Sequence, residues 1–135
     1  MAKNKVKIIL EGEPQPWTHS LSHRSKEYNY RKQDALIKTL SLEAQYKNKP
    51  PLSGPITLSC NFYFPFPPRM PMSQKLLLRN TVYSTNPLLS ELFRYIEAIS
   101  RGVLFNDTAT IVSTTGTKYY DLDPRTEITI IEINK

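Results

Sequence analysis

Hydrophobic and polar residues alternate in several short segments of the chain, and this alternation predicts β-strands. In residues 5–11, lysines alternate with Val6 and Ile8. In residues 125–133, Thr126, Ile128 and Ile130 alternate with polar or exposed positions. A third strand is expected over residues 56–64, where one face collects the apolar side chains of Ile56, Leu58, Cys60, Phe62 and Phe64.

Helical spacing of apolar residues predicts two main helices and one short one. Residues 31–47 carry a loose apolar face of Ala35, Leu36, Leu40, Leu42 and Ala44. A longer helix is expected from Pro87, which suits a first turn, to the stop signal Gly102. Its apolar positions are Leu88, Leu92, Tyr95, Ile96 and Ile99. A short helix over residues 73–79 would be capped by Ser73.

The remaining segments complete the predicted order of elements. Residues 12–30 contain two early prolines and mixed polar and aromatic residues, and they are expected to form a long loop. Residues 65–71 are proline-rich and end the strand before them. Residues 110–119 are rich in threonine and predict another strand. This order indicates an α+β fold, a single domain with a mixed sheet of about four strands and two main helices.

The charge of the chain is unevenly distributed. The 135 residues hold 18 Lys+Arg against 12 Asp+Glu, a net charge of +6. Residues 1–82 contain 13 basic and 5 acidic residues, whereas residues 83–135 contain 5 basic and 7 acidic ones. A basic first half suits a polyanion such as nucleic acid, and it equally suits ordinary solvation.

Composition excludes several other classes of protein. Cys60 is the only cysteine, so neither an internal disulfide nor a cysteine-based zinc site can form. No apolar run reaches the roughly 18 residues of a membrane span, so we expect no membrane partner. The first residues lack the apolar core of a signal peptide. We therefore expect a cytoplasmic protein, associated with the nucleoid if it binds DNA.

Cations and flat aromatic rings are mixed in the predicted loop and just after it. Such cations contact phosphates, and such rings stack on unpaired bases. A second basic stretch precedes the long helix. The candidate DNA-binding residues are therefore Trp17, Arg24, Lys26, Tyr28, Arg31, Lys32, Arg69, Lys75 and Arg79. The alternative is that the rings pack on the sheet while the charges face solvent.

Four short motifs occur in a characteristic order along the chain: EGEP at residues 11–14, LSGP at 52–55, GVLFND at 102–107 and PRTEI at 124–128. In these motifs the chain resembles the RusA-like family of phage and bacterial Holliday-junction resolvases, as a single domain over residues 1–135. The resemblance implies a homodimer that binds four-way DNA junctions and cuts them with Mg²⁺, in DNA recombination and repair.

The chain departs from that family where the family holds its metal. The resemblance implies a signature P-D-x-D-N-L-x-K before the long helix and a pair of aspartates after it. Aligned without gaps, the family's metal-binding aspartates correspond to Leu88, Ser90 and Thr108, and the lysine corresponds to Arg94. Leucine offers no ligand, and neutral hydroxyls are weak ligands for Mg²⁺. The resemblance therefore implies DNA binding with lost or weakened nuclease activity.

Two other interpretations are open. Glu91 and Asp107, with Arg94 at a phosphate, could form a rearranged catalytic site that uses Mg²⁺; alternatively Asp107 caps a turn and Glu91 is a solvated helix charge. A third hypothesis is a non-DNA protein, such as an inhibitor, that reuses the fold to bind a protein partner. The apolar surface of Leu88, Leu89, Leu92, Phe93 and Ile96 is either core or a dimer interface.

Overall fold

The computed structural model describes residues 5–17 and 26–133, with the side chains of all of these except 26–29. One mixed sheet contains β1 (Lys5–Glu11), β2 (Pro55–Phe64), β3 (Thr110–Tyr120) and β4 (Arg125–Glu132). The strand order is β1-β4-β2-β3. The β2 and β3 strands are parallel, and β4 is antiparallel to both β1 and β2. The predicted α+β fold with four strands is confirmed.

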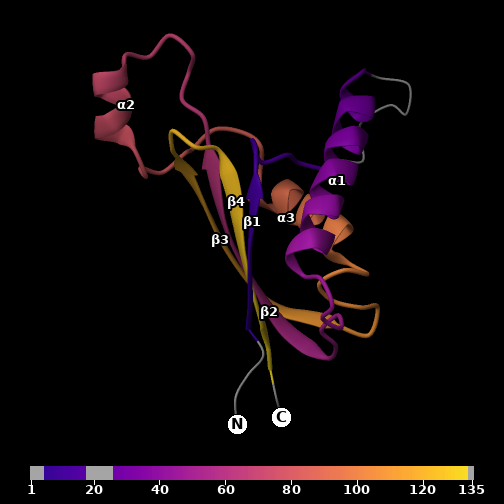
Figure 1. Cartoon of the computed structure of the whole chain (residues 1–135). Helices are drawn as coiled ribbons and strands as arrows, with labels where there is room; N and C mark the ends of the chain where they lie inside the picture. Colours follow the sequence, from indigo (N-terminus) through magenta and orange to yellow (C-terminus); the bar gives the residue numbers. More distant parts are fainter. Residues whose placement is uncertain (1–4, 18–25, 134–135) are drawn as a thin grey trace.

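Two helices cover one face of this sheet and a third lies apart from it. In Figure 1, α1 (Lys26–Gln45) and α3 (Leu89–Ser100) lie on the same side of the strands, whereas α2 (Met72–Leu78) projects from one end. The hydrophobic core lies between the sheet and α1 and α3. Alternate residues of β1, β2 and β4 point into this core, as their period-two patterns predict: Val6, Ile8, Leu10, Ile56, Leu58, Cys60, Phe62, Phe64, Ile128 and Ile130.

The structure corrects three predicted boundaries. The first helix begins at Lys26, so the loop expected to reach residue 30 is shorter than predicted. A polar and aromatic composition does not prevent helix formation, and the breakers Pro14 and Pro16 come well before Lys26. The α2 helix begins after Pro71, with no side-chain cap from Ser73. Pro87 precedes the N-terminal residue of α3 instead of occupying its first turn.

The prediction of which residues form the apolar face of the first helix is also wrong. Leu36 and Leu40 are exposed, at 61% and 64%, and only Leu42 of the predicted face is fully buried. Lys38 is buried instead, because its side chain turns inward toward Asp34 and the backbone of Glu13. The apolar spacing in this helix was loose, and a loose pattern does not determine which face packs on the sheet.

The predicted apolar surface of α3 is partly core. Leu92 and Ile96 are buried, together with Tyr95 and Ile99 of the same helix. Leu89 and Phe93 are partly buried and pack against the core. Leu88, at the start of the helix, is 56% exposed. The helix ends before Gly102, whose φ of 95° is the left-handed conformation that glycine adopts easily.

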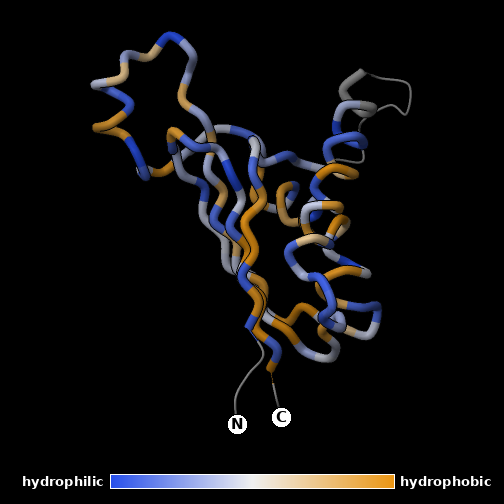
Figure 2. Tube along the Cα trace, viewed as in Figure 1, coloured by the Kyte–Doolittle hydropathy of each residue, from blue (hydrophilic) through white to orange (hydrophobic). Residues whose placement is uncertain are grey.

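Residues 65–83 form an arm that leaves the sheet and returns to it. None of the residues of α2 is buried, and Met72, Leu76 and Leu77 are exposed. Figure 2 shows hydrophobic residues in this arm, away from the body of the protein. At its base, Tyr83 donates its backbone N–H to Lys118 and Tyr120 donates to Thr81. These bonds attach the returning segment to the end of β3.

Candidate nucleic-acid interface

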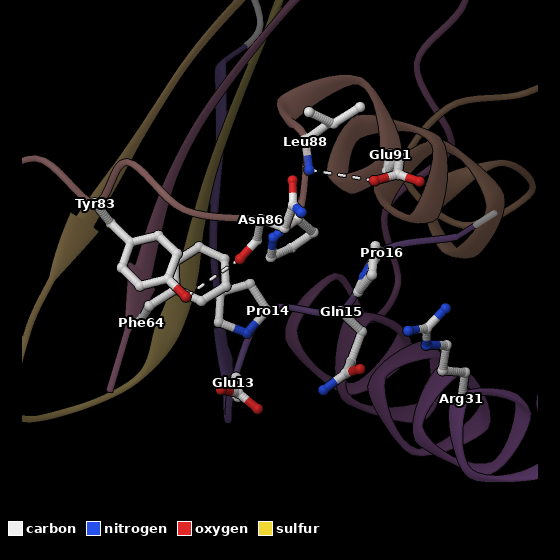
Figure 3. A pocket seen from close by; sticks show the side chains of 11 residues that line it. Glu13, Pro14, Gln15, Pro16, Arg31, Phe64, Tyr83, Asn86, Leu88 and Glu91 are labelled. Atoms are coloured by element: carbon white, nitrogen blue, oxygen red, sulfur yellow. Dashed lines mark hydrogen bonds between the residues drawn. The ribbon is translucent and has the colours of Figure 1, made fainter. Parts of the chain in front are cut away.

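A pocket of about 660 Å³ opens where the start of α3 meets α1 and the segment after β1. Figure 3 shows Glu13, Gln15, Arg31, Asn86 and Glu91 around it. The pocket therefore combines a guanidinium, two carboxylates and two amides. Phe64 and Tyr83 stack at one wall, with ring centroids 4.3 Å apart and planes nearly parallel. Rigid aromatic walls and polar groups of both signs suit a polar ligand more than an apolar one.

Glu91 has a structural task in this pocket. Its Oε1 accepts a hydrogen bond of 3.2 Å from the backbone N–H of Leu88, as Figure 3 shows. This bond satisfies one of the amide groups that a helix start leaves without an intrahelical partner. The backbone carbonyl of Glu91 accepts from the N–H of Trp17, which ties the segment after β1 to α3. The positive end of the helix dipole also stabilises a carboxylate in this position.

Within one copy of the chain, the three residues expected at the family's metal positions lie far apart. Leu88 and Ser90 lie at the start of α3, whereas Thr108 follows its end. Twelve helical residues rise about 18 Å at 1.5 Å per residue. The Arg101 guanidinium donates to the carbonyl of Asn106, which fixes the residues around Thr108 beside the C-terminal end of the helix. Within one copy of the chain, Thr108 is therefore separated from Leu88 and Ser90 by roughly the length of α3.

Asp107 lies at the same distant end and does not approach Glu91. It is exposed in the turn between α3 and β3. The neighbouring Asn106 caps this turn, because its Oδ1 accepts from both the backbone N–H and the hydroxyl of Thr108. The structure thus brings Glu91 together with Leu88, and it places Asp107 apart from both.

The residues at these positions do not fit a magnesium ion. Mg²⁺ takes oxygen ligands in octahedral geometry, with one or two carboxylates in most protein sites. Across residues 5–17 and 26–133, no group of three His, Cys, Asp or Glu side chains is placed to hold a metal ion. Cys60 is no substitute, because it is buried and burial raises the pKa of its thiol.

Arg94 is exposed on α3 beside a second groove. This groove, of about 610 Å³, lies between α3 and β3 and is lined by Leu89, Ser90, Phe93, Arg94, Glu97, Thr114 and Gly116. Ser90 and Arg94 are one turn apart on α3, and both line this groove. Within the described part of the chain, no carboxylate forms an ion pair with Arg94.

The predicted DNA-binding cations separate into two groups. Arg31 lines the pocket at the start of α3, and Lys32 follows it on α1 with an exposed side chain. The second group, Arg69, Lys75 and Arg79, lies on the projecting arm. Arg79 is partly committed there, since its Nε donates to Asp121 Oδ1 at 2.6 Å while 44% of its side chain stays exposed. Arg24 lies outside the described residues, as do the side chains of Lys26 and Tyr28.

Trp17 has a packing role in this structure. Its ring is half-buried against the core, 6.1 Å from the ring of Tyr95 and tilted by 50°. Its backbone N–H bonds to α3. An aromatic ring that packs on a helix supports the alternative interpretation for this residue, in which the ring covers the core.

A buried polar cluster, which the sequence patterns did not predict, lies between α1 and α3. Tyr95 donates its hydroxyl to Asp34 Oδ2 at 2.5 Å, and Lys38 Nζ lies 3.0 Å from the same oxygen. Burial lowers the pKa of Lys38, although Asp34 opposes this effect. Burial and the bond to Asp34 raise the pKa of Tyr95. The spacing of Asp34 and Lys38, four residues apart on a helix, is the sequence signal that indicates a pair.

A second missed cluster anchors the arm. Asp121 is 1% exposed and accepts from Arg79, from Arg125 at 2.5 Å and from the backbone N–H of Leu122. Burial alone would raise the pKa of Asp121, but these bonds outweigh it and the pKa is lowered. The Arg125 guanidinium also stacks on Tyr63, 3.9 Å from the ring centre. The arm is therefore held at a fixed position relative to the sheet.

A basic α+β domain with a cation-bearing arm and a polar pocket at a helix start has the features of a protein that acts on DNA. Comparison with known families is more specific. The model of the endodeoxyribonuclease RusA family matches residues 12–131, and the chain belongs to that family. No curated protein is significantly similar to the chain. No helix within the described residues is long and apolar enough to cross a membrane.

Proposed function

We propose that this chain binds branched DNA of the Holliday-junction type and has lost, or nearly lost, the Mg²⁺-dependent endonuclease activity of its family. The observation that carries this proposal is that no group of three His, Cys, Asp or Glu side chains within the described residues is placed to hold a metal ion. It agrees with the expectation that Leu88, Ser90 and Thr108 occupy the family's metal positions. A metal ion that activates water and neutralises phosphate charge needs acidic side chains as ligands.

The charge along the chain supports DNA binding. No aspartate or glutamate occurs between Glu43 and Glu91, whereas this stretch contains five cations: Lys47, Lys49, Arg69, Lys75 and Arg79. The arm that carries three of them stands clear of the sheet (Figure 1), where a large ligand has access. Arg94 retains a positive charge at the position of the family's lysine. Cations without nearby acids attract the phosphate backbone of DNA.

The proposal extends to the assembly and location of the protein. We propose a homodimer, because a four-way junction has two equivalent strands and a two-fold dimer matches that symmetry. We also propose a cytoplasmic location at the nucleoid, where branched DNA forms during recombination.

A competing proposal is an active nuclease with a rearranged site. Glu91 and Asp107 would be its acids and Mg²⁺ its cofactor. Two features argue against this proposal. The Glu91 carboxylate already accepts a hydrogen bond from the N–H of Leu88, and most of the length of α3 separates Glu91 from Asp107 within one copy of the chain. Mg²⁺-dependent cutting that Asp107→Asn or Glu91→Gln abolishes would establish this second function.

A non-DNA role has one specific observation in its favour. The exposed Met72, Leu76 and Leu77 give the arm an apolar surface that suits a protein partner. Purification with a protein partner and without nucleic acid would favour this role. The acid-free basic stretch around the same residues makes DNA the better-supported ligand.

The deciding experiment is a binding and cleavage assay on a four-way junction and a matched linear duplex, with and without Mg²⁺. We expect binding that prefers the junction and weakens with salt, and no cleavage in either condition. Absence of junction binding at low salt would overturn the proposal. The double variant Arg24→Ala/Lys26→Ala is expected to bind more weakly, which tests the part of the predicted interface that lies outside the described residues.

A further inference from the structure

The α2 helix presents an exposed apolar surface at the far end of the arm. Met72 and Leu76 lie four residues apart, so they share one face of the helix, and Leu77 follows directly. Leu77 is 82% exposed, the highest value among the exposed large apolar side chains of the described residues. We call these three residues the apolar tip. Exposed apolar groups that lie together mark a binding surface in many soluble proteins.

The arm is attached to the sheet at both of its ends. On the outgoing side, the ring of Phe66 stacks on the ring of Tyr120, with centroids 5.1 Å apart. On the returning side, the N–H of Asn80 donates to the carbonyl of Tyr120 at 2.7 Å, and Arg79 pairs with the buried Asp121. The apolar tip therefore stands at a fixed place away from the sheet (Figure 1), where it can contact a ligand outside the protein.

Cations lie on both sides of the apolar tip in the chain. Arg69 precedes α2, Lys75 lies within it and Arg79 follows it, and no acidic residue occurs between Glu43 and Glu91. A surface of this kind is complementary to a ligand that carries negative charge outside and apolar groups inside. DNA has this organisation, because its phosphates surround the stacked bases.

The faces of the bases are accessible only where the stack is interrupted. In a continuous duplex each base covers its neighbours, and an inserted side chain must first unstack them. At the branch point of a junction the stack already changes course, so insertion costs less there. Leucine and methionine are among the side chains that proteins insert between base steps. The chemistry of the apolar tip thus matches a branch point better than a duplex.

We infer that the apolar tip occupies the branch point of a DNA junction, with Leu76 and Leu77 against the faces of the bases and Arg69 and Lys75 at the neighbouring phosphates. This inference rests on the proposed function and deepens it. The cations supply affinity for any DNA, whereas the apolar tip supplies the preference for branched over linear DNA.

The first test compares affinities for a four-way junction and for a linear duplex of the same sequence. Leu76→Ala/Leu77→Ala keeps good helix formers and removes no buried side chain, so the arm should stay folded. It should weaken junction binding by about tenfold and leave duplex binding unchanged. The matched control is Leu36→Ala/Ile37→Ala, an adjacent apolar pair that is 61% and 67% exposed on α1, and it should change neither affinity.

The second test detects insertion directly with 2-aminopurine, a base analogue whose fluorescence rises when it is unstacked. With the analogue at the branch point, the natural protein at saturation should raise the emission, and Leu76→Ala/Leu77→Ala should not. Arg69→Ala/Lys75→Ala should still raise it once enough protein is added, because its apolar tip is intact.

The outcomes separate this inference from the proposed function. If the leucine variant keeps the natural preference for the junction and the natural rise in emission, the inference is overturned, and the apolar tip is left for a protein partner. Equal weakening on junction and duplex also overturns it, since the leucines then contribute to DNA binding in general. If the natural protein binds no junction at low salt, the proposed function fails and the inference fails with it.

Discussion

Gly116 of β3 lies directly against the ring of Phe93 on α3. A Cβ atom at Gly116 would lie 2.5 Å from Cε2 and 2.7 Å from Cζ of that ring, closer than carbon atoms approach. The same ring packs edge-on against Phe62 of β2, with centroids 5.5 Å apart. The absence of a side chain at Gly116 therefore allows the first turns of α3 to pack closely against the sheet.

Substitution of Gly116 by alanine should destabilise the protein. The added methyl group forces Phe93 off its packing position, and overpacking of this kind costs about 1–3 kcal/mol. Urea unfolding followed by circular dichroism measures the change. In a Phe93→Leu background, where the ring is absent, the same Gly116→Ala change should cost less than half as much. Equal losses in both backgrounds would show that the ring is not the cause.

Asp121 makes the stability of the protein depend on pH in acid. Hydrogen bonds from Arg125 and Arg79 outweigh burial and lower the pKa of this carboxyl group in the folded state. A lowered pKa contributes stability that is complete above the ordinary aspartate pKa of about 3.9 and is lost as the pH falls through the folded value. The free energy of unfolding should therefore fall below about pH 4.

The variant Asp121→Asn isolates this effect. It should be less stable by about 1–3 kcal/mol at neutral pH, because it replaces charged hydrogen bonds inside a buried site. The difference from the natural protein should shrink below about pH 4. Asp123→Asn, an exposed neighbour in the same turn, is the matched control and should change little. A constant difference from pH 7 to pH 3 would contradict the assignment to Asp121.

The sheet was predictable from sequence because its strands have strict patterns. Val6 and Ile8 alternate with lysines, and Ile128 and Ile130 alternate with Glu127 and Thr129, so one face of each strand is determined. The first helix was harder. Its apolar residues occupy both faces, and the inward position of Lys38 depends on Asp34 and on a carbonyl group 25 residues away. Local spacing contains no information about such a distant partner.

The site was predictable only in part for the same reason. Leu88, Ser90 and Thr108 could be aligned with family positions, but their separation along α3 is a property of the folded chain. The hydrogen bond from Leu88 to Glu91 has the three-residue spacing of a capping box, but that sequence signature requires a polar residue at the first position, and Leu88 does not match it. The pairing of Arg79 and Arg125 with Asp121 joins residues 42 and 4 positions apart in the chain. Only the pair Arg125 and Asp121, four residues apart, could be recognised from the local sequence.

Gln45 is expected to protect the β1 edge. Its amide group makes two hydrogen bonds with the backbone of Ile9, as a neighbouring strand would. Gln45→Ala should lower the free energy of unfolding by about 1 kcal/mol, since the bonds are exposed. It should also increase aggregation on prolonged incubation, measured by light scattering, because the edge loses its guard. Gln33→Ala, at an exposed position on the same helix, should change neither property.

The arm should contribute to DNA affinity through charge. Arg69 is exposed and Lys75 is half-buried on a helix with no buried side chain, so neither supports the core. Each cation that contacts a phosphate adds about 0.9 to the slope of log K against log salt concentration. The double variant Arg69→Ala/Lys75→Ala should therefore bind a junction more weakly at low salt, with a slope reduced by about 2. Lys5→Ala/Lys7→Ala, which removes two exposed cations of β1, is the control with equal net charge. If both double variants lower the slope equally, the effect comes from overall charge and the arm has no special contact with DNA.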